Sequence, residues 1–461
     1  MVNESNSEAP AEAIDGATPV RREIRAVVRL ATPVVIVQVG MMAMGVVDTM
    51  MLGRVSEHAL AAGALGHVLS FGLMVFGMGF LMALDPLVSQ AFGADDHVRL
   101  GRHLQRGLVV SIVLSTALSV LMWDLRWLMH RLGQDASIID DTAAYIRAAV
   151  PGVVAFLLFT VLRQTLQAMS ETRQALVAIV VANAVNVVAN YALIFGRWGA
   201  PELGVVGSGL ATSLSRWTMV LLIAWAGWPI FGRYLKDVRR AIFQPSTYAP
   251  LVRLGIPIGF QISLEMWLFT TVALMMGNLG ARELAAHQIA LNLAALSFMV
   301  PLGIAGAAAT RVGNAIGRGD AAGTRRSAAV CLGLGAGVMT FSAVIFAVFP
   351  QALARLYTSE MAVVTLAATL LPIAALFQVF DGLQVVGAGV LRGAADTRIP
   401  AIIAFVGYWL LGLPVAYVFG IHLGHGPRGL WWGLTFGLAA AALLFLARIR
   451  VTLRGEISRY A

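Results

Sequence analysis

Three carboxylates lie deep within apolar stretches of this 461-residue chain: Asp48, Glu265 and Asp381. Almost every other acidic residue lies outside such stretches. A carboxylate in hydrocarbon costs about 2.5–3.5 kcal/mol on insertion scales, so it is retained mainly where it faces a cavity, a partner or an ion. The chemistry that these residues indicate is the binding and release of a cation or a proton, as in a transport site.

Asp381 has an amide on either side of it along one helical face. Gln378, Asp381 and Gln384 follow each other at intervals of three residues, so they share roughly one face of a helix. A carboxylate between two amides supplies several oxygen ligands, which a hard cation or a proton site requires. The pattern favours an ion or proton site over a structural contact between helices.

Glu265 follows Gln261 by one turn and shares its face. A carboxyl group in the membrane can alternate between a protonated form and an ion-bound form, so either Na⁺ or H⁺ fits as the coupling ion. If Na⁺ is the coupling ion, Glu265 and Asp381 are the residues expected to bind it. The alternative is a structural glutamate that bonds to another helix.

Asp48 is the acid at mid-depth in the first half of the chain, and Thr49 follows it. Its chemistry is open: it can anchor a cationic substrate, relay protons or complete a local network. Asn186 and Asn190 belong to one amide-bearing helical face together with Asn183. We expect them to line a polar cavity near Asp48, although asparagines also connect membrane helices.

A second pair of amides, Gln288 and Asn292, lies at i and i+4 and is expected to support the same polar cavity. The neighbouring His287 is expected near the outer membrane interface and is not assigned to the site. Asp85, which precedes Pro86, is expected to be a structural residue at the membrane interface.

The elements that position these residues are membrane helices. Hydrophobic residues make up 59% of the chain and charged residues 12%, where about 25% charged is usual for a soluble protein. The mean hydropathy is +0.80. Segments long enough to cross about 30 Å of hydrocarbon are predicted at 27–52, 62–90, 104–124, 146–168, 175–196, 204–228, 251–277, 284–309, 327–349, 362–391, 399–421 and 429–447. The fold class is an all-α integral membrane protein with twelve transmembrane helices.

The net charge of +9 orients the chain and does not indicate a nucleic-acid partner. Of the 33 Lys and Arg residues, 24 fall on one side of the predicted topology. Positive residues are retained in the cytoplasm, so both termini and the middle linker are expected there.

The chain is an internal duplication. Residues 33–102 align with 257–326 without a gap and share 15 identities in 70 pairs, against about six expected from this composition. Six helices return each repeat to its starting side, so the repeats are parallel and two lobes face a central cavity. The predicted organisation is a disordered cytoplasmic tail (1–20), a first lobe (21–228), a cytoplasmic linker (229–250), a second lobe (251–448) and a cytoplasmic C-terminal tail (449–461).

Motifs for enzymatic chemistry are absent from the sequence. It contains no HExxH, no GxSxG and no GxxxxGK[ST], and its one lysine, Lys236, lies in the predicted linker. The single cysteine, Cys331, cannot form an internal disulfide. We expect a non-enzymatic transporter that needs no cofactor and couples to an ion gradient.

Several motifs resemble those of the multidrug and toxic compound extrusion (MATE) transporters, specifically the bacterial NorM-like branch. They include GVVDTMMLGRVSEHALAAGALG, GIPIGFQISLEMWLF, FDGLQVVGAGVLRGAADTRIP and YWLLGLPVAYVFG. The resemblance extends from about residue 27 to residue 447. It implies that Asp48, Glu265 and Asp381 match the family's functional acids, and that Asn186 and Asn190 match its fifth-helix asparagines.

The resemblance implies an antiporter that exports amphipathic organic cations, such as drugs or dyes, in exchange for inward Na⁺ or H⁺. Such a protein is expected to act as a monomer in the lipid bilayer. The alternative is a flippase for lipid-linked oligosaccharides with a similar two-lobe architecture. Its anionic cargo favours a basic cavity, whereas Arg216 is the one basic residue that the sequence places within a helix.

Overall fold

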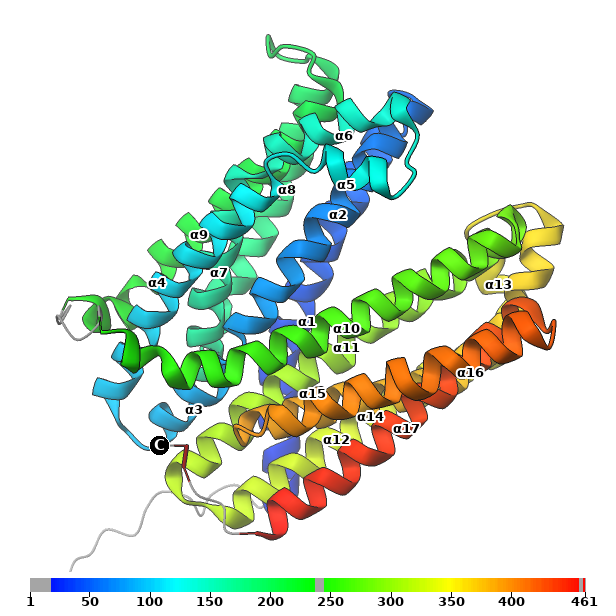
Figure 1. Ribbon diagram of the computed structural model, residues 1–461. Helices are drawn as coiled ribbons and strands as arrows, with labels where there is room; N and C mark the ends of the chain where they lie inside the picture. The colour runs from blue at the N-terminus through cyan, green and yellow to red at the C-terminus, as the bar shows by residue number, and fades with distance from the viewer. Residues whose placement is uncertain (1–17, 237–243, 456–458, 461) are drawn as a thin grey trace, which may run out of the picture.

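The computed structural model describes residues 18–236, 244–455 and 459–460. Within these ranges the regular structure is helical, and twelve helical segments are long and apolar enough to cross a membrane. The predicted fold class is confirmed. Figure 1 shows the two halves of the chain as two bundles, which meet at one end of the molecule and diverge toward the other.

The two lobes follow each other in the sequence. The first lobe comprises α1 (Pro19–Leu52), α2 (Glu57–Leu81), α3 (Leu84–Gly93), α4 (His97–Met122), α5 (Arg126–Arg131), α6 (Ala136–Ala149), α7 (Pro151–Ala168), α8 (Arg173–Phe195) and α9 (Gly204–Leu235). The second lobe comprises the 3₁₀ turn η2 (Pro245–Tyr248), α10 (Ala249–Leu279), α11 (Ala281–Arg318), α12 (Ala321–Val348), α13 (Pro350–Arg355), α14 (Met361–Gly393), α15 (Arg398–Phe405), the π-helical η3 (Val406–Gly412), α16 (Leu413–Tyr417), the π-helical η4 (Val418–His422) and α17 (Gly426–Arg454).

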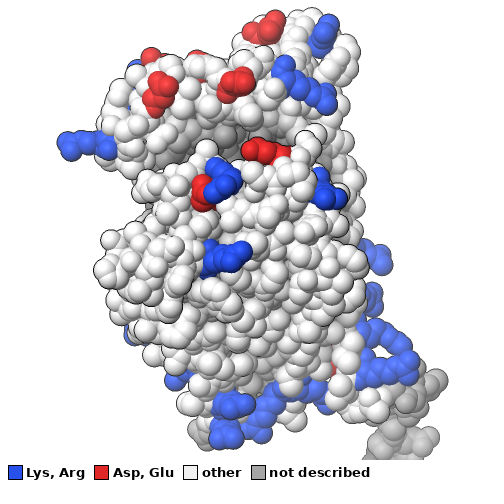
Figure 2. Space-filling model, turned by 90° about the vertical axis from the view of Figure 1, so that its right-hand side faces the viewer, with Lys and Arg blue, Asp and Glu red and all other residues white. Residues whose placement is uncertain are grey.

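Basic side chains gather at the end where the lobes meet, and this end is called the basic end below. Figure 2 shows Lys and Arg concentrated at the lower end of one face, while acidic residues lie near its upper end, where the surface is hollowed between the lobes. Arg99 and Arg106 line one surface pocket at the basic end. Arg29 and Arg173 line another.

The helices extend beyond the apolar stretches at the basic end. The last helix of the first lobe, α9, continues through Pro229 to Leu235, so the predicted linker starts later than residue 229. Likewise α17 continues to Arg454, past the predicted start of the C-terminal tail. Hydropathy marks only the apolar part of a helix, whereas the backbone hydrogen bonds continue into its polar ends. Residues 1–17 of the predicted N-terminal tail lie outside the described residues.

The two lobes exchange the basic-end halves of two equivalent helices. Val27 and Leu30 of α1 are buried in the core that the second lobe forms. Leu251 and Leu254 of α10 occupy the repeat-equivalent positions and are buried in the core of the first lobe. Each lobe is therefore completed by a helix end from the other, which holds the lobes together at the basic end.

The duplication is also visible in the backbone at the corners between helices. Asp95 and Gly319 occupy equivalent positions and both have positive φ, 57° and 73° respectively. Ser170 (65°) and Ala395 (58°) form a second such pair. Positive φ is uncommon for residues other than glycine, so its recurrence at matching positions confirms two parallel repeats.

Glycines bring the repeats together across the pseudo-two-fold axis. A Cβ atom added at Gly93 in α3 would meet the backbone of Asn314 in α11. A Cβ atom added at Gly317 would meet the backbone of Gln90. Because residues 90 and 93 are equivalent to 314 and 317, these two contacts are symmetric copies of each other. Small residues allow the close helix packing on which membrane helices depend.

Candidate functional site

The first polar cluster surrounds Asp48 within the first lobe. Asp48 is 5% exposed, and its Oδ1 accepts hydrogen bonds from the Nδ2 atoms of Asn186 (3.1 Å) and Asn190 (2.6 Å) in α8. Its Oδ2 accepts a hydrogen bond from Thr212 Oγ1 in α9 at 2.7 Å. The structure thus brings both predicted asparagines to Asp48. Three donors from two neighbouring helices match the ionised carboxylate, which only accepts hydrogen bonds.

Other members of this cluster were not evident from the sequence. Tyr145 of α6 lies beside Thr212 and within electrostatic range of Asp48. Arg216 of α9 also lies within range of Asp48, and its guanidinium lies over the Phe156 ring at 5.3 Å. Arg216 was visible in the sequence as a basic residue within a helix. Tyr145 and Thr212 carried no comparable signal.

The second cluster lies in the second lobe and contains the other two acids. Asp381 of α14 is 5% exposed and lies within electrostatic range of Glu265 in α10. Tyr408 of η3 lies within range of both carboxylates and is 1% exposed. The next residue, Trp409, donates from Nε1 to the backbone oxygen of Leu264 at 3.1 Å, which ties η3 to α10 beside Glu265. Short π-helical segments often occur at functional sites.

Gln378 and Gln384 extend the second cluster along α14. Gln378 Oε1 accepts hydrogen bonds from Ser297 Oγ at 2.6 Å and Ser342 Oγ at 2.8 Å. Gln384 is 1% exposed, and its Oε1 has no hydrogen-bond partner among the described residues. The same holds for Oδ1 of Asp381 and the hydroxyl of Tyr408. Buried polar atoms normally have partners, so these atoms are candidates to interact with a cation, a proton or water.

The two clusters therefore differ in their hydrogen bonding. Both oxygens of Asp48 are engaged by donors of its own lobe, whereas one oxygen of Asp381 has no partner within the described part of the chain. In that same part no group of three or more His, Cys, Asp or Glu side chains is placed to hold a metal ion. A cation in the second lobe would thus be held by Glu265 and Asp381 together with neutral oxygens. These residue types fit a hard monovalent cation or a proton.

The remaining predicted residues lie outside these hydrogen-bond networks. Gln261 is buried nearer the basic end and lines a small cavity with Arg392 and Thr397. Gln288 and Asn292 have exposed side chains on α11, and their role in lining a cavity stays a prediction.

The His287 side chain is fully buried, and its ring meets Trp431 edge to face with centroids 5.7 Å apart. Its expected depth near the outer membrane interface stays a prediction. The α11 helix turns this face toward α17, where the apolar core of the second lobe covers it. Neither ring nitrogen has a hydrogen-bond partner among the residues that the structure describes.

Asp85 is expected at the membrane interface, and the structure adds that its side chain is buried between the lobes. Asp85 is 1% exposed, and its Oδ2 accepts a hydrogen bond from Arg392 Nε of the other lobe at 2.9 Å. Arg163 in α7 is buried nearby, so Arg216 is not the one basic residue within a helix. Sequence topology assigned these side chains to the interface because it records depth along a helix and not the packing of lobes.

Comparison with known proteins identifies the family. The family model MatE matches residues 33–192 and 257–418, one match in each repeat. The chain belongs to the MATE family. It is 36% identical over 443 residues to the probable multidrug resistance protein NorM of Mesorhizobium japonicum, covering 93% of this chain and 94% of that protein. It is also 36% identical over 438 residues to the multidrug resistance protein MdtK of Edwardsiella ictaluri, covering 93% and 95%.

Solved structures agree with the assignment to the MATE fold. The eukaryotic MATE transporter AtDTX14 superposes with a TM-score of 0.86 at 24% identity, covering 94% of this chain and 98% of that one. A multidrug resistance MATE family transporter in an outward-facing conformation superposes with a TM-score of 0.84 at 20% identity, covering 95% and 99%. The resemblance to NorM-like MATE transporters is therefore confirmed.

Proposed function

We propose that this MATE protein is a secondary antiporter, which exports amphipathic organic cations in exchange for inward Na⁺ or H⁺. The observation that carries the proposal is the second-lobe cluster. Asp381 keeps one oxygen without a hydrogen-bond partner among the described residues while facing the charge of Glu265. Two carboxylates that share a buried site need a cation or a proton between them, because their like charges repel.

The relatives support the nature of the cargo. NorM and MdtK are both named multidrug resistance proteins, and each aligns with nearly the whole of this chain. The first-lobe cluster supplies a buried carboxylate, Asp48, in the lobe that lacks Glu265 and Asp381. We assign substrate or proton handling to Asp48 and ion coupling to Glu265 and Asp381.

The orientation follows from the distribution of charge. Arginines concentrate at the basic end, and positive residues are retained in the cytoplasm. We therefore place the basic end, with both chain ends, on the cytoplasmic side of the bacterial inner membrane. The lobes meet at that end and diverge at the other, which with this orientation supports our proposal of a state open to the outside.

Coupling requires that each ligand binds the two conformations with different affinity. A ligand that binds both conformations equally does not shift the equilibrium between them. In the proposed cycle the cation or proton favours the conformation in which substrate is released outward. The dissociation of that ion into the cytoplasm then favours the return to substrate binding.

The test is dye efflux from proteoliposomes under separately imposed Na⁺ and H⁺ gradients. Asp381→Asn is expected to reduce gradient-driven efflux to about a tenth of the wild-type rate or less, since it removes a charge that distinguishes the bound from the free state. Asp140→Asn changes an exposed aspartate in α6 and serves as the matched control. Full efflux by Asp381→Asn would contradict the assignment of the coupling site. Equal dye accumulation with and without the wild-type protein would contradict the proposed function itself.

A further inference from the structure

A buried ion pair joins the two lobes at the basic end. Asp85 in α3 belongs to the first lobe and Arg392 in α14 to the second. Their side chains are 2% and 10% exposed, and Arg392 Nε donates to Asp85 Oδ2 at 2.9 Å. An ion pair this deeply buried gains little over an apolar contact, but removal of one partner leaves a strongly unfavourable unpaired charge.

A second buried arginine competes for the same carboxylate. Arg163 of α7 is 8% exposed and lies within electrostatic range of both Asp85 and Arg392. Its Nη1 donates to Gln167 Oε1 at 3.3 Å. Its Nε has no hydrogen-bond partner within the described ranges of the chain. One carboxylate therefore faces two guanidinium groups, and only one of them, that of Arg392, is bonded to it.

The two arginines lie on different sides of the seam between the lobes. Arg163 belongs to the same lobe as Asp85, and its neighbours Val161 and Leu162 are buried in that lobe's core. Val390 and Leu391, which precede Arg392, are buried in the other core. If the lobes separate at the basic end, Arg392 leaves with the second lobe and Arg163 stays with Asp85.

The ion pair is absent from the symmetric half of the seam. The repeat-equivalent of Asp85 is Ala309, and that of Arg392 is Gln167. On that side the lobes are joined by a neutral hydrogen bond from Thr310 Oγ1 to the backbone oxygen of Gln167, at 3.4 Å. The positions equivalent to Asp85 and Arg392 are thus neutral, so the repeated scaffold does not require charges there, although a different ion pair, between Glu23 of α1 and Arg311 of α11, also joins helices of the two lobes.

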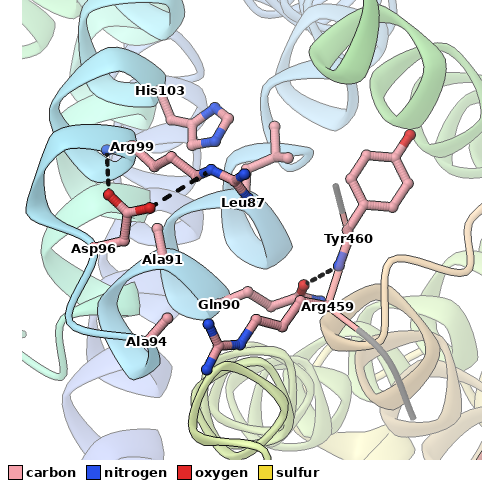
Figure 3. Close-up of a pocket in the computed structure, with 9 residues that line it drawn as sticks. All are labelled: Leu87, Gln90, Ala91, Ala94, Asp96, Arg99, His103, Arg459 and Tyr460. Carbon is pink, nitrogen blue, oxygen red and sulfur yellow. Dashed lines mark hydrogen bonds and ion pairs between the residues drawn. The ribbon is translucent and has the colours of Figure 1, made fainter. Parts of the chain in front are cut away.

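Neighbouring contacts show how closely this seam is sealed. Gln90 of α3 donates from Nε2 to the backbone oxygen of Gly393 at 3.0 Å. Its Oε1 accepts a hydrogen bond from the backbone nitrogen of Tyr460 at 2.8 Å, as Figure 3 shows. Opening the seam therefore also breaks the hydrogen bond between Gln90 and Gly393.

We propose that Asp85 is an exchangeable latch that controls opening at the basic end. In the closed state it pairs with Arg392 across the seam. When the lobes separate it pairs with Arg163 of its own lobe, so the carboxylate is never left unpaired. Arg392 thus stabilises the closed basic end, while Arg163 stabilises the open one. The latch rests on the proposed function, because it presupposes lobes that separate during transport.

The test uses the opposite effects expected of the two arginines. Spin labels on the cysteines of Val98→Cys and Val451→Cys, exposed positions near the basic ends of α4 and α17, report lobe separation by pulsed electron paramagnetic resonance in lipid. The native thiol is removed by Cys331→Ala. Arg392→Gln is expected to raise the ratio of open to closed molecules by about tenfold or more, and Arg163→Gln is expected to lower it by a similar factor.

The control is Arg448→Gln, which breaks the ion pair with Asp396 (2.6 Å) at the same end but within one lobe. It should leave the label distances unchanged. In an Asp85→Asn background the two arginine substitutions should lose their opposite effects, because they no longer share a carboxylate. Shifts in the same direction, or no shifts beyond that of the control, would overturn the latch.

If either glutamine variant does not reach the membrane, the lysine variants Arg392→Lys and Arg163→Lys are measured instead. Lysine keeps the charge but loses the planar fork, so smaller shifts with the same opposite signs are expected, and equal signs again overturn the latch. Dye efflux by the labelled wild type separates the two hypotheses: efflux without opposite shifts rejects only the latch, whereas absence of efflux rejects the proposed function.

Discussion

The tightest contact with backbone atoms at the seam makes a quantitative prediction about Gly93→Ala. A Cβ atom at this position would overlap the carbonyl oxygen of Asn314 and lie 2.8 Å from its Cα. Carbon atoms in contact normally lie about 3.5–4.0 Å apart. Because the obstacle is backbone, no change of rotamer can relieve the overlap, and α3 and α11 must move apart by about 1 Å.

This overpacking is expected to cost the closed basic end about 1–3 kcal/mol. The open conformation relieves it, so the ratio of open to closed molecules should rise by about 5- to 150-fold. The same spin-label distance between positions 98 and 451 measures this ratio, and dye efflux should fall as the outward-open state is depleted.

A matched control is available in α12. An added Cβ atom at Gly333 meets no atom within 4 Å, so Gly333→Ala should leave the distance distribution unchanged. If Gly93→Ala gave the same distances as Gly333→Ala, the seam would have to be looser than the structure indicates, and the reasoning would be refuted.

Two further predictions concern stability in detergent. Thr212→Val keeps the shape of the side chain but removes the donor to Asp48 Oδ2, and the unsatisfied carboxylate oxygen should cost about 1–3 kcal/mol and lower Tm. Arg311→Gln breaks an ion pair with Glu23 that contains two hydrogen bonds. The Glu23 side chain is 7% exposed, so the loss of its partner should lower the free energy of unfolding by about 3–5 kcal/mol.

Each of these variants has a control in the same helix. Thr218→Val removes a hydroxyl of α9 that bonds only to the backbone of its own helix. Arg282→Gln breaks an exposed ion pair at the start of α11, and exposed pairs contribute about 0–1 kcal/mol. If Tm fell no further in these variants than in the controls, the buried hydrogen bond and the buried ion pair would not contribute the predicted stability.

The sequence by itself determined the helices and the duplication. Apolar length is a local property, and it located all twelve membrane-crossing segments. Gapless self-alignment of residues 33–102 with 257–326 predicted parallel repeats, which the paired positive φ angles confirm. Amide spacing along one helical face linked Asn186 and Asn190 with Asp48, and the structure brings them into hydrogen bonding.

Only the tertiary structure decided how the lobes meet. Asp85 and Arg392 are 307 residues apart, so the sequence near either residue does not predict their contact. The same holds for Tyr408, whose place near Glu265 and Asp381 depends on the packing of a π-helical turn against α10. Hydrophobicity and periodicity report which face of a helix is buried, whereas the partner of a buried charge depends on where a distant helix packs.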